Sequence, residues 1–388
     1  MRGSIVKRGK NSYTIILNIG TDSITGKRKQ QWVSVKGNKK DAEKRLSELL
    51  HQIDTGSFIK PTKDTLTGYL EKWLKDYVWP NLAPRTAEGY EHIMRHHIIP
   101  TLGNIVMNKL KPEHLQRYFS EKLSGGLSAQ TVRHHYTALH KALNTAVEWG
   151  LLSRNIADVV KTPHSQQTEM QTWDEEDVAK FLELAKDSPY YTLFYTALFT
   201  GMRRSEYLAL RWSDLDLLLC QVYVNRSLHV LKGGQVIYRS PKTAKGRRMI
   251  ALSPSMASVL REHYEKAKLE RDMLGVSLKN NDLVFCQPDG SPLLPNTVTH
   301  AWIKLVRRNS LKPIRLHDAR HTHASLMLKQ GAHPKVVQER LGHAGIQITL
   351  DIYSHVAPGL QEAAAKRFDD ILTAKYNKHG KEAIEKIR

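Results

Sequence analysis

The amino-acid sequence predicts a multi-domain α+β protein. We expect a small sheet-plus-helix domain, an all-α bundle, and a mixed, mainly α-helical domain with a small antiparallel sheet. The 388 residues are enough for two or three domains. A pattern of two strands and one helix ends near residue 58, a helical pattern follows from about residue 64, and a polar, Pro-containing segment at 161–172 is typical of a linker. We therefore expect domains at 1–58, 64–162 and 173–375, followed by a short charged tail at 376–388.

Residues 1–58 predict two strands and one helix. The strands, at 13–19 and 31–35, are rich in β-branched and aromatic residues. A helix follows Asn38 and ends near Gly56, with apolar residues at helical spacing. Residues 1–60 hold 13 Lys and Arg against 5 Asp and Glu. A sheet with this charge could contact DNA through its strands, and the alternative is a solvated basic face on an accessory domain.

Residues 64–162 predict a helical bundle. An amphipathic face runs from Leu66 to Tyr77, and Pro84 is well placed to begin a helix that we expect to stop before Pro100. Further helices are predicted at 112–123 and from the N-cap residue Ser128 to Gly150. Basic and hydrogen-bonding side chains on these helices are candidate contacts to DNA phosphates and bases, although any surface helix carries such residues. The candidates are Arg85, Thr86, Arg95, Arg133, His134 and Lys141, with His96 and His135 among them in the same pattern.

Residues 173–375 combine helices and strands. Strands are predicted near Val222 and Val236, and a hairpin-like stretch at 242–248 leads into an apolar run at 249–252. The predicted helices lie near 174–186, 190–199, 203–210, 255–273, 296–309, 318–330, 334–341 and 347–355.

The charge of the chain favours a polyanionic partner. Lys and Arg outnumber Asp and Glu by 59 to 38, which gives a net charge of +21 and a pI of about 9.8. A pI above about 9 is typical of nucleic-acid-binding proteins, and the alternatives are solubility alone or attraction to anionic lipid. No stretch is apolar for the roughly 18 residues of a membrane span. Two cysteines and the lack of an apolar signal core predict a cytoplasmic protein without a disulfide framework.

Two segments of the third domain carry arginines suited to binding phosphate. The run Thr200-Gly-Met-Arg203 can present a guanidinium from the start of a helix, because glycine permits a tight turn. Arginine grips two phosphate oxygens at once, although a single arginine after glycine is more often a surface residue. In His317-Asp-Ala-Arg320 the imidazole and guanidinium fall on one helix face and can converge on one phosphate. The nearby His321 and His323 have a spacing that fits a zinc site poorly.

A histidine and a tyrosine follow in order. His343 stands after Leu341 and Gly342, and Tyr353 lies one short predicted helix further on. Taken alone, His343 would be a capping or core histidine and Tyr353 a buried helix tyrosine. Together with the two arginines they supply the groups needed to break a phosphodiester through a covalent intermediate.

These motifs resemble those of the tyrosine recombinases of phages and conjugative elements. The ordered set is Thr200-Gly-Met-Arg203, a hairpin lysine in Pro241-Lys242-Thr243, His317-x-x-Arg320, Leu341-Gly-His343 and Tyr353. The resemblance extends, more weakly, to an arm-site DNA-binding domain at 1–58 and a core-binding domain at 64–162. Lys245, Arg247 and Arg248 surround Lys242 and leave open which cation the hairpin presents, and Arg204 is the alternative to Arg203.

The resemblance implies a role for each residue. Tyr353 would attack the scissile phosphate to form a 3′-phosphotyrosyl bond, and Lys242 would protonate the departing 5′ oxygen. Arg203 and Arg320 would bind the non-bridging oxygens. His317 would accept the tyrosine proton, and His343 would hydrogen-bond the phosphate. No cofactor or metal ion is expected, and the sequence contains no Gly-x-x-x-x-Gly-Lys-Ser/Thr loop for ATP.

We therefore expect a site-specific recombinase that integrates and excises a mobile element. Its expected partners are double-stranded attachment sites of core and arm type, three further protomers in a tetramer, and an excisionase or DNA-bending host protein. A type IB topoisomerase is the first alternative. A non-catalytic DNA-binding regulator is the second, since residues 324–343 could pass for a helix-turn-helix.

Overall fold

The computed structural model describes residues 3–21, 26, 28–54, 63–164, 170–241, 246–279, 282–356, 365–366, 368–370 and 373. Of these, the side chains of 19–21, 28–29 and 352–356 are not described. Contacts divide the chain into two compact units, Met1–Gln167 and Thr168–Arg388, here called unit 1 and unit 2. The domain boundaries predicted from the sequence stay predictions, and the predicted tail at 376–388 lies outside the described residues.

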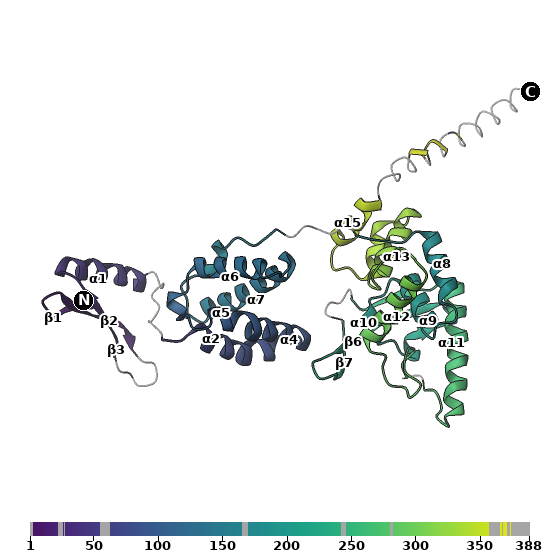
Figure 1. Ribbon diagram of the computed structural model, residues 1–388, viewed down its shortest axis with the longest axis horizontal. Coiled ribbons are helices and arrows are strands. Elements are labelled where there is room, and N and C mark those ends of the chain that lie inside the picture. Colours follow the sequence, from purple (N-terminus) through teal and green to yellow (C-terminus); the bar gives the residue numbers. More distant parts are fainter. Residues whose placement is uncertain are drawn as a thin grey trace, which may run out of the picture. The chain divides into compact units, whose positions relative to one another are not determined.

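Unit 1 begins with a three-stranded antiparallel sheet in the order β1-β2-β3 and a helix, α1, that packs on it (Figure 1). Ile15 and Leu17 on β2 are fully buried against Leu49 of α1. The side chain of Asn38 accepts a hydrogen bond from the Asp41 amide and so begins the helix at the predicted place. The elements are β1 (Gly3–Gly9), β2 (Ser12–Thr21), β3 (Arg28–Lys36) and α1 (Lys39–Asp54), of which β1 was not predicted.

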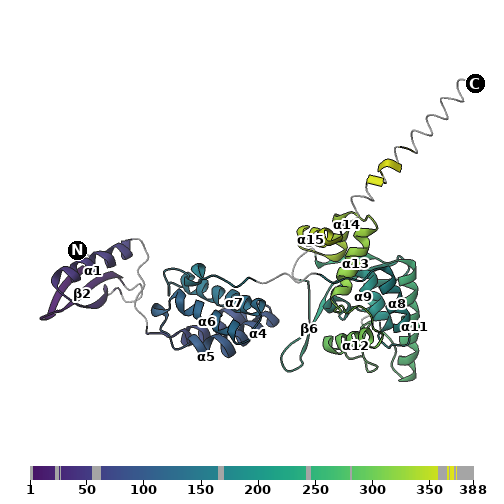
Figure 2. The same ribbon diagram turned by 45° about the horizontal axis from the view of Figure 1, so that its top comes forward.

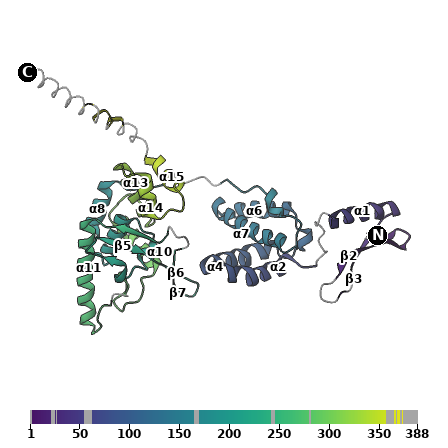
Figure 3. The same cartoon turned by 180° about the vertical axis from the view of Figure 1, so that it is seen from behind.

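The rest of unit 1 is the predicted helical bundle (Figure 3). Trp73, Tyr118 and Leu139 are among its fully buried residues. Pro84 begins a helix as predicted, and Ser128 caps another by accepting from the Thr131 amide. The elements are α2 (Leu66–Trp73), η1 (Leu74–Val78), α3 (Trp79–Asn81), α4 (Pro84–Ile93), η2 (Met94–Ile98), α5 (Ile99–Leu102), η3 (Met107–Lys109), α6 (Pro112–Ser124), α7 (Ala129–Glu148) and η4 (Ile156–Val159).

The prediction that the helix from Pro84 stops before Pro100 was wrong. The chain passes through a π-helical turn, η2, and continues past Pro100 to Leu102. In that turn the Ile99 amide donates to the carbonyl of Met94, five residues back. The wider turn leaves room for the proline ring and for its missing N–H, which would break an ordinary α-helix. The same device, η1, precedes Pro80.

Unit 2 is mainly helical with two small antiparallel sheets, ordered β4-β5-β8 and β6-β7. The fold class predicted from the sequence is confirmed, and β4 and β6 are additions to the predicted strands. The helices are α8 (Glu175–Ala185), α9 (Tyr191–Thr200), α10 (Arg204–Tyr207), η5 (Trp212–Asp214), α11 (Pro254–Met273), α12 (Pro295–Arg308), α13 (Asp318–Lys329), α14 (Pro334–Leu341) and α15 (Gln347–Val356). The strands are β4 (Leu215–Asp216), β5 (Gln221–Val224), β6 (Ser227–Val230), β7 (Val236–Arg239) and β8 (Arg248–Ala251).

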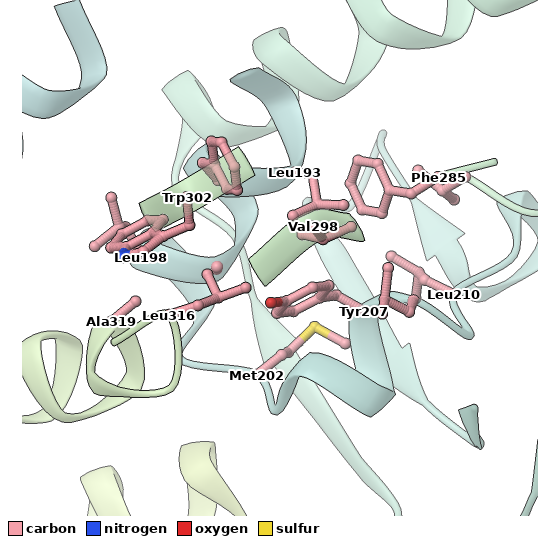
Figure 4. Packing of buried hydrophobic residues seen from close by; sticks show 14 of the residues in the cluster. Leu193, Leu198, Met202, Tyr207, Leu210, Phe285, Val298, Trp302, Leu316 and Ala319 are labelled. Carbon is pink, nitrogen blue, oxygen red and sulfur yellow. The ribbon is translucent and has the colours of Figure 1, made fainter. Parts of the chain in front are cut away.

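The core of unit 2 fixes the elements that carry the predicted site. Trp173 and Trp302 stack with ring centroids 5.1 Å apart at its centre. Figure 4 shows Tyr207 of α10 and Ala319 of α13 within the same cluster, so both elements are held by buried apolar side chains. Within unit 2, α13, α14 and α15 lie together at one end and α11 runs along the opposite edge (Figures 1 and 2). Within the described part of the chain, no helix combines the length and apolarity needed to cross a membrane.

Candidate active site

The turn after α9 presents Arg203 at the start of α10. Gly201 adopts a left-handed conformation with φ of 63°, which an L side chain rarely adopts, so the helix ends sharply there. Glu206 fixes Arg203 from three residues further on. Its carboxylate accepts hydrogen bonds from the Arg203 amide and from Nη1, both at 2.8 Å. The Arg203 side chain is still 38% exposed, so it can reach a ligand in solvent.

Arg320 lies deeper. Its side chain is on α13 and only 4% of the residue is exposed. Nη1 donates to the carbonyl of Gly201 and Nη2 to the carbonyl of Leu341, each at 2.7 Å. Burial, with a contribution from the charge of Arg203, lowers the pKa of Arg320 to about 9, so the guanidinium is charged at neutral pH. Arg320 therefore links the Arg203 turn to the end of α14.

His343 is held in the loop that follows α14. Gly342 ends that helix in a left-handed conformation with φ of 66°. His343 is 5% exposed, and its Nδ1 lies 2.9 Å from the Thr349 hydroxyl. Burial and the charges of Arg320 and Arg203 lower its pKa to about 3. The ring is therefore neutral at pH 7.

The structure brings these three residues together. Nη2 of Arg203 donates to the carbonyl of Gly342 at 3.1 Å, and Arg320 binds the preceding carbonyl, that of Leu341. Both guanidiniums thus hold the segment that leads directly into His343. In keeping with this proximity, the charge of Arg203 lowers the pKa values of Arg320 and His343, and the charge of Arg320 lowers that of His343.

His317 lies beside this cluster, just before α13. It is exposed, and its ring makes an edge contact with His321 at 5.2 Å between centroids. Surrounding protein atoms, and then the charges of His321 and Arg320, lower the pKa of His317 to about 4. A neutral imidazole is the form that can accept a proton.

Arg203 and His317 line one groove of about 1060 Å³. Its lining combines basic and apolar residues, with Ile303, Val306 and Leu316 among the apolar ones. Arg204, Arg307 and Arg315 add positive charge, although Arg315 pairs with Asp318 at 2.9 Å. Arg204 instead donates to the Thr299 hydroxyl at 2.6 Å. The contacts therefore distinguish Arg203, which faces the cluster, from Arg204, which is bound to α12.

The two remaining predicted residues are only partly placed. Tyr353 lies in α15, which packs against α13 and α14, but its side chain is outside the described residues. Residues 242–245 of the hairpin-like stretch predicted at 242–248, with Lys242 among them, are also outside the described residues. The roles of both residues stay predictions.

One of the histidines considered for zinc, His323, is bound by other parts of the protein. Nδ1 of His323 lies 2.9 Å from the carbonyl of Leu198, and Arg340 Nε donates to its Nε2 at 3.0 Å. Both ring nitrogens are therefore occupied, and burial lowers the pKa of His323 to about 3. Among the described residues, no three His, Cys, Asp or Glu side chains are grouped to bind a metal ion.

Two arginines support the cluster in a way that the sequence did not reveal. Arg248, on β8, binds both oxygens of Glu206, with Nη2 at 2.9 Å and Nη1 at 3.2 Å. Arg340 donates to the carbonyls of Ala251 and Phe199 at 2.8 and 3.0 Å. The sequence places Arg248 only among the cations that surround Lys242. Strand alternation could have found its orientation, because it shares a face with the buried Ile250.

Two of the candidate DNA contacts of the bundle are paired with carboxylates. Arg85 pairs with Glu88 at 3.1 Å, and Arg95 pairs with both Glu71 and Glu91 at 2.9 and 3.0 Å. Such carboxylates compete with DNA phosphates for an arginine. Thr86 is half-buried in α4.

The candidates on α7 differ in exposure. Arg133 and His134 are exposed, and Lys141 lies over the Tyr77 ring at 5.3 Å. His135 follows the same sequence pattern but is buried, with Nδ1 2.9 Å from the Tyr118 hydroxyl, and burial lowers its pKa to about 4. Treating His135 as a surface residue was wrong, because it occupies the inward face of the helix.

Comparison with known proteins identifies related families and folds. Residues 171–359 match the phage integrase family, and residues 65–123 match the N-terminal SAM-like domain of phage integrases. The ICEBs1 integrase of Bacillus subtilis is 28% identical over 95% of this chain and 100% of its own length. A XerC-like tyrosine recombinase of Caldanaerobacter subterraneus is 29% identical over 94% and 98%.

Solved structures share the fold. The Tn1549 transposon integrase in complex with transposon right end DNA superposes with a TM-score of 0.68 at 22% identity, over 78% of this chain and 99% of its own. A lambda integrase tetramer bound to a Holliday junction gives a TM-score of 0.57 at 17% identity, over 90% and 94%.

Proposed function

Because this chain belongs to the phage integrase family of tyrosine recombinases, and so is a site-specific DNA recombinase, we propose a role for each residue of its active site. Tyr353 Oη attacks the scissile phosphorus, and the P–O5′ bond breaks to leave a 3′-phosphotyrosyl linkage. His317 takes the phenolic proton, and Lys242 supplies the proton that the 5′ oxygen needs. The reverse reaction, with a 5′-hydroxyl of another strand, rejoins the DNA. The bond energy is kept in the ester, so no ATP is consumed.

The observation that carries this proposal is the meeting of Arg203, Arg320 and His343 at one backbone segment. Both guanidiniums are held by hydrogen bonds before any ligand arrives. Donors fixed in advance stabilise the charge that develops on the non-bridging oxygens without having to reorganise. The helix that carries Tyr353 packs against the helix that carries Arg320, which supports the nucleophile assignment.

The two histidines suit different roles because of their surroundings. His317 is solvent-accessible and neutral, as a general base must be. A tyrosine with an ordinary pKa of about 10 needs such a base and nearby positive charge to attack at pH 7. His343 is buried, and the Thr349 hydroxyl can donate to its Nδ1. Its Nε2–H then serves as a neutral donor to the phosphate.

The N-terminal sheet is suited to binding DNA with its outer face. One face is covered by α1, whereas Trp32 on the other is 55% exposed with the Arg8 guanidinium 5.8 Å from its ring centre. We assign this domain to arm-type sites and the helical bundle to core-type sites. An aromatic and basic sheet face can enter a groove or lie along the phosphates.

Exchange of two duplexes requires four active sites, so we assign a tetramer on DNA as the working form. The lambda integrase tetramer on a Holliday junction supports this assembly. The product is an integrated or excised mobile element. An excisionase or DNA-bending protein as the factor that sets direction stays a prediction.

Covalent trapping tests the assignment of the nucleophile. A nicked attachment-site duplex lets the 5′-hydroxyl fragment diffuse away, so a protein that cleaves stays attached to DNA. Wild-type protein should be trapped and Tyr353→Phe should not, measured as a shifted band on a denaturing gel. The matched control is Tyr238→Phe, which removes the hydroxyl of an exposed tyrosine on β7. Trapping of Tyr353→Phe at the wild-type level would overturn the assignment.

A further inference from the structure

Glu206 is a buried carboxylate shared by two arginines. Its side chain is 5% exposed, and it accepts from Arg203 Nη1 at 2.8 Å and from Arg248 Nη2 at 2.9 Å. A buried carboxylate is unstable unless charged donors surround it. Arg203 alone is a poor partner for this purpose, because its guanidinium must also reach toward DNA. Arg248 therefore supplies the second, fully internal counter-charge.

Arg248 is itself committed to the protein interior. Its side chain is 6% exposed. Besides both oxygens of Glu206, it binds the carbonyl of Arg340 through Nε at 2.6 Å and the carbonyl of Gly246 through Nη1 at 3.3 Å. The N–H donors of Arg248 are thus bound by acceptors from three different parts of the protein. Arg248 is thus placed to hold other groups rather than to contact phosphate.

We propose that Arg248 is a positioning residue that acts through Glu206 to fix the phosphate-binding guanidinium of Arg203. This inference rests on the proposed function, in which Arg203 binds the scissile phosphate. Glu206 is negative, and it lies one hydrogen bond from the group that must receive a negative phosphate. Arg248 offsets that charge, so Glu206 can orient Arg203 without repelling the substrate. The two guanidiniums thereby divide the tasks of binding and support.

The protonation of Glu206 distinguishes this positioning role of Arg248 from a purely structural one. Hydrogen bonds from Arg248, and then the charges of Arg248 and Arg203, lower the pKa of Glu206 although burial acts to raise it. The charge of Arg320 also interacts with that of Glu206. Replacing Arg248 should raise the pKa of Glu206, so that the carboxyl protonates at a higher pH and releases Arg203. The cleavage rate of the variant should therefore fall more steeply than that of wild type as the pH is lowered.

The experiment measures the rate of covalent trapping on the nicked duplex between pH 8 and pH 6. We expect Arg248→Met to cleave between about ten- and a hundredfold more slowly than wild type at neutral pH, since it loosens one transition-state donor. The deficit should grow toward pH 6. Arg248→Lys keeps the charge and should recover the acid side of the profile in part. An Arg248→Met rate deficit that is constant with pH would overturn the proposal.

A double-mutant cycle with Glu206→Gln tests the route of the effect. If Arg248 acts through Glu206, Arg248→Met should slow cleavage much less in the Glu206→Gln background than in wild type. Additive losses would show that Arg248 acts independently and would reject the proposal.

The matched structural control is Arg226→Met. Arg226 binds the buried carboxylate of Asp214 at 2.7 Å, and Asp214 also accepts from the Arg211 amide, which repeats the Glu206 arrangement elsewhere in unit 2. We expect a similar loss of thermal stability and no change in the pH profile. A profile shift in Arg226→Met would reduce the Arg248 effect to general destabilisation. Failure of wild type to be trapped would reject the proposed function itself, which is a separate outcome.

Discussion

Replacing Gly201 with alanine should destabilise the fold and disturb the active site. The structure separates the backbone and packing contributions to the lost stability. Gly201 ends α9 with φ of 63° and stands two residues before Arg203. A Cβ atom there would lie 2.6 Å from Leu341 Cδ2 and 2.7 Å from His323 Cδ2. Real Cβ atoms do not approach carbon so closely, so something must move.

The backbone conformation and the close contacts each contribute to the loss of stability. A left-handed conformation costs an alanine about 1–2 kcal/mol. Overpacking against the buried Leu341 and the half-buried His323 adds about 1–3 kcal/mol. His323 cannot yield easily, because its ring nitrogens are bound to Leu198 and Arg340. The total is about 2–5 kcal/mol, the sum of these two ranges, and relief by moving the turn would displace Arg203.

Gly275→Ala isolates the backbone contribution. Gly275 has φ of 69°, and no atom of the described residues lies within 4 Å of the position that an alanine Cβ would take there. Full-length variants should be compared by thermal unfolding, where 1 kcal/mol corresponds to roughly 2–4 °C for a domain of this size. Gly201→Ala should melt well below Gly275→Ala, and only Gly201→Ala should lose covalent trapping at a temperature where both are folded. Equal melting temperatures would refute the reasoning from close contact.

Three further outcomes are expected. The pKa values of His323 and His343 are lowered to about 3, so below about pH 6.5 the unfolded chain gains protons that the folded chain does not. The melting temperature should therefore fall between pH 7.5 and 5.5, and it should fall less steeply in His343→Gln. An unchanged slope in that variant would count against a neutral buried His343. Arg320→Ala should keep most attachment-site affinity in filter binding while losing cleavage, since one cation among many adds little to DNA binding, and loss of binding at low salt would contradict this division. Deleting residues 1–58 should abolish gel-shift binding to arm-type sites and spare cleavage of an isolated core site, whereas intact arm binding would show that another part of the chain is responsible.

Local signals in the sequence predicted most of the helices because each start is encoded nearby. Asn38 and Ser128 cap their helices with their own side chains, and Pro84 stands at a first helical position. The strand β1 was missed because Lys7, Arg8 and Gly9 interrupt its apolar pattern. Pro100 was taken as a stop because a π-turn that accommodates proline leaves no signature in the residues themselves.

The sequence predicts a set of site residues but not their contacts. Order and spacing selected Arg203, Arg320 and His343, which the structure brings to one backbone segment, and their roles stay predictions. That Arg320 binds the carbonyl of Gly201 could not be read from the chain, because 119 residues separate the two. The role of Arg340 is equally hidden, since its partners Phe199 and Ala251 offer only backbone atoms, which every residue has.

The cation site is built from hydrogen bonds to carbonyl oxygens, and this has a functional consequence. Arg203 and Arg320 are held by the carbonyls of Gly342, Gly201 and Leu341 and by Glu206. If the two guanidiniums bind phosphate as proposed, these contacts should be enough to position them, whereas cleavage should also require the phenolic oxygen of Tyr353. On this basis Tyr353→Phe should bind an intact attachment site as tightly as wild type. A large loss of affinity in that variant would mean that the phenol takes part in forming the phosphate site.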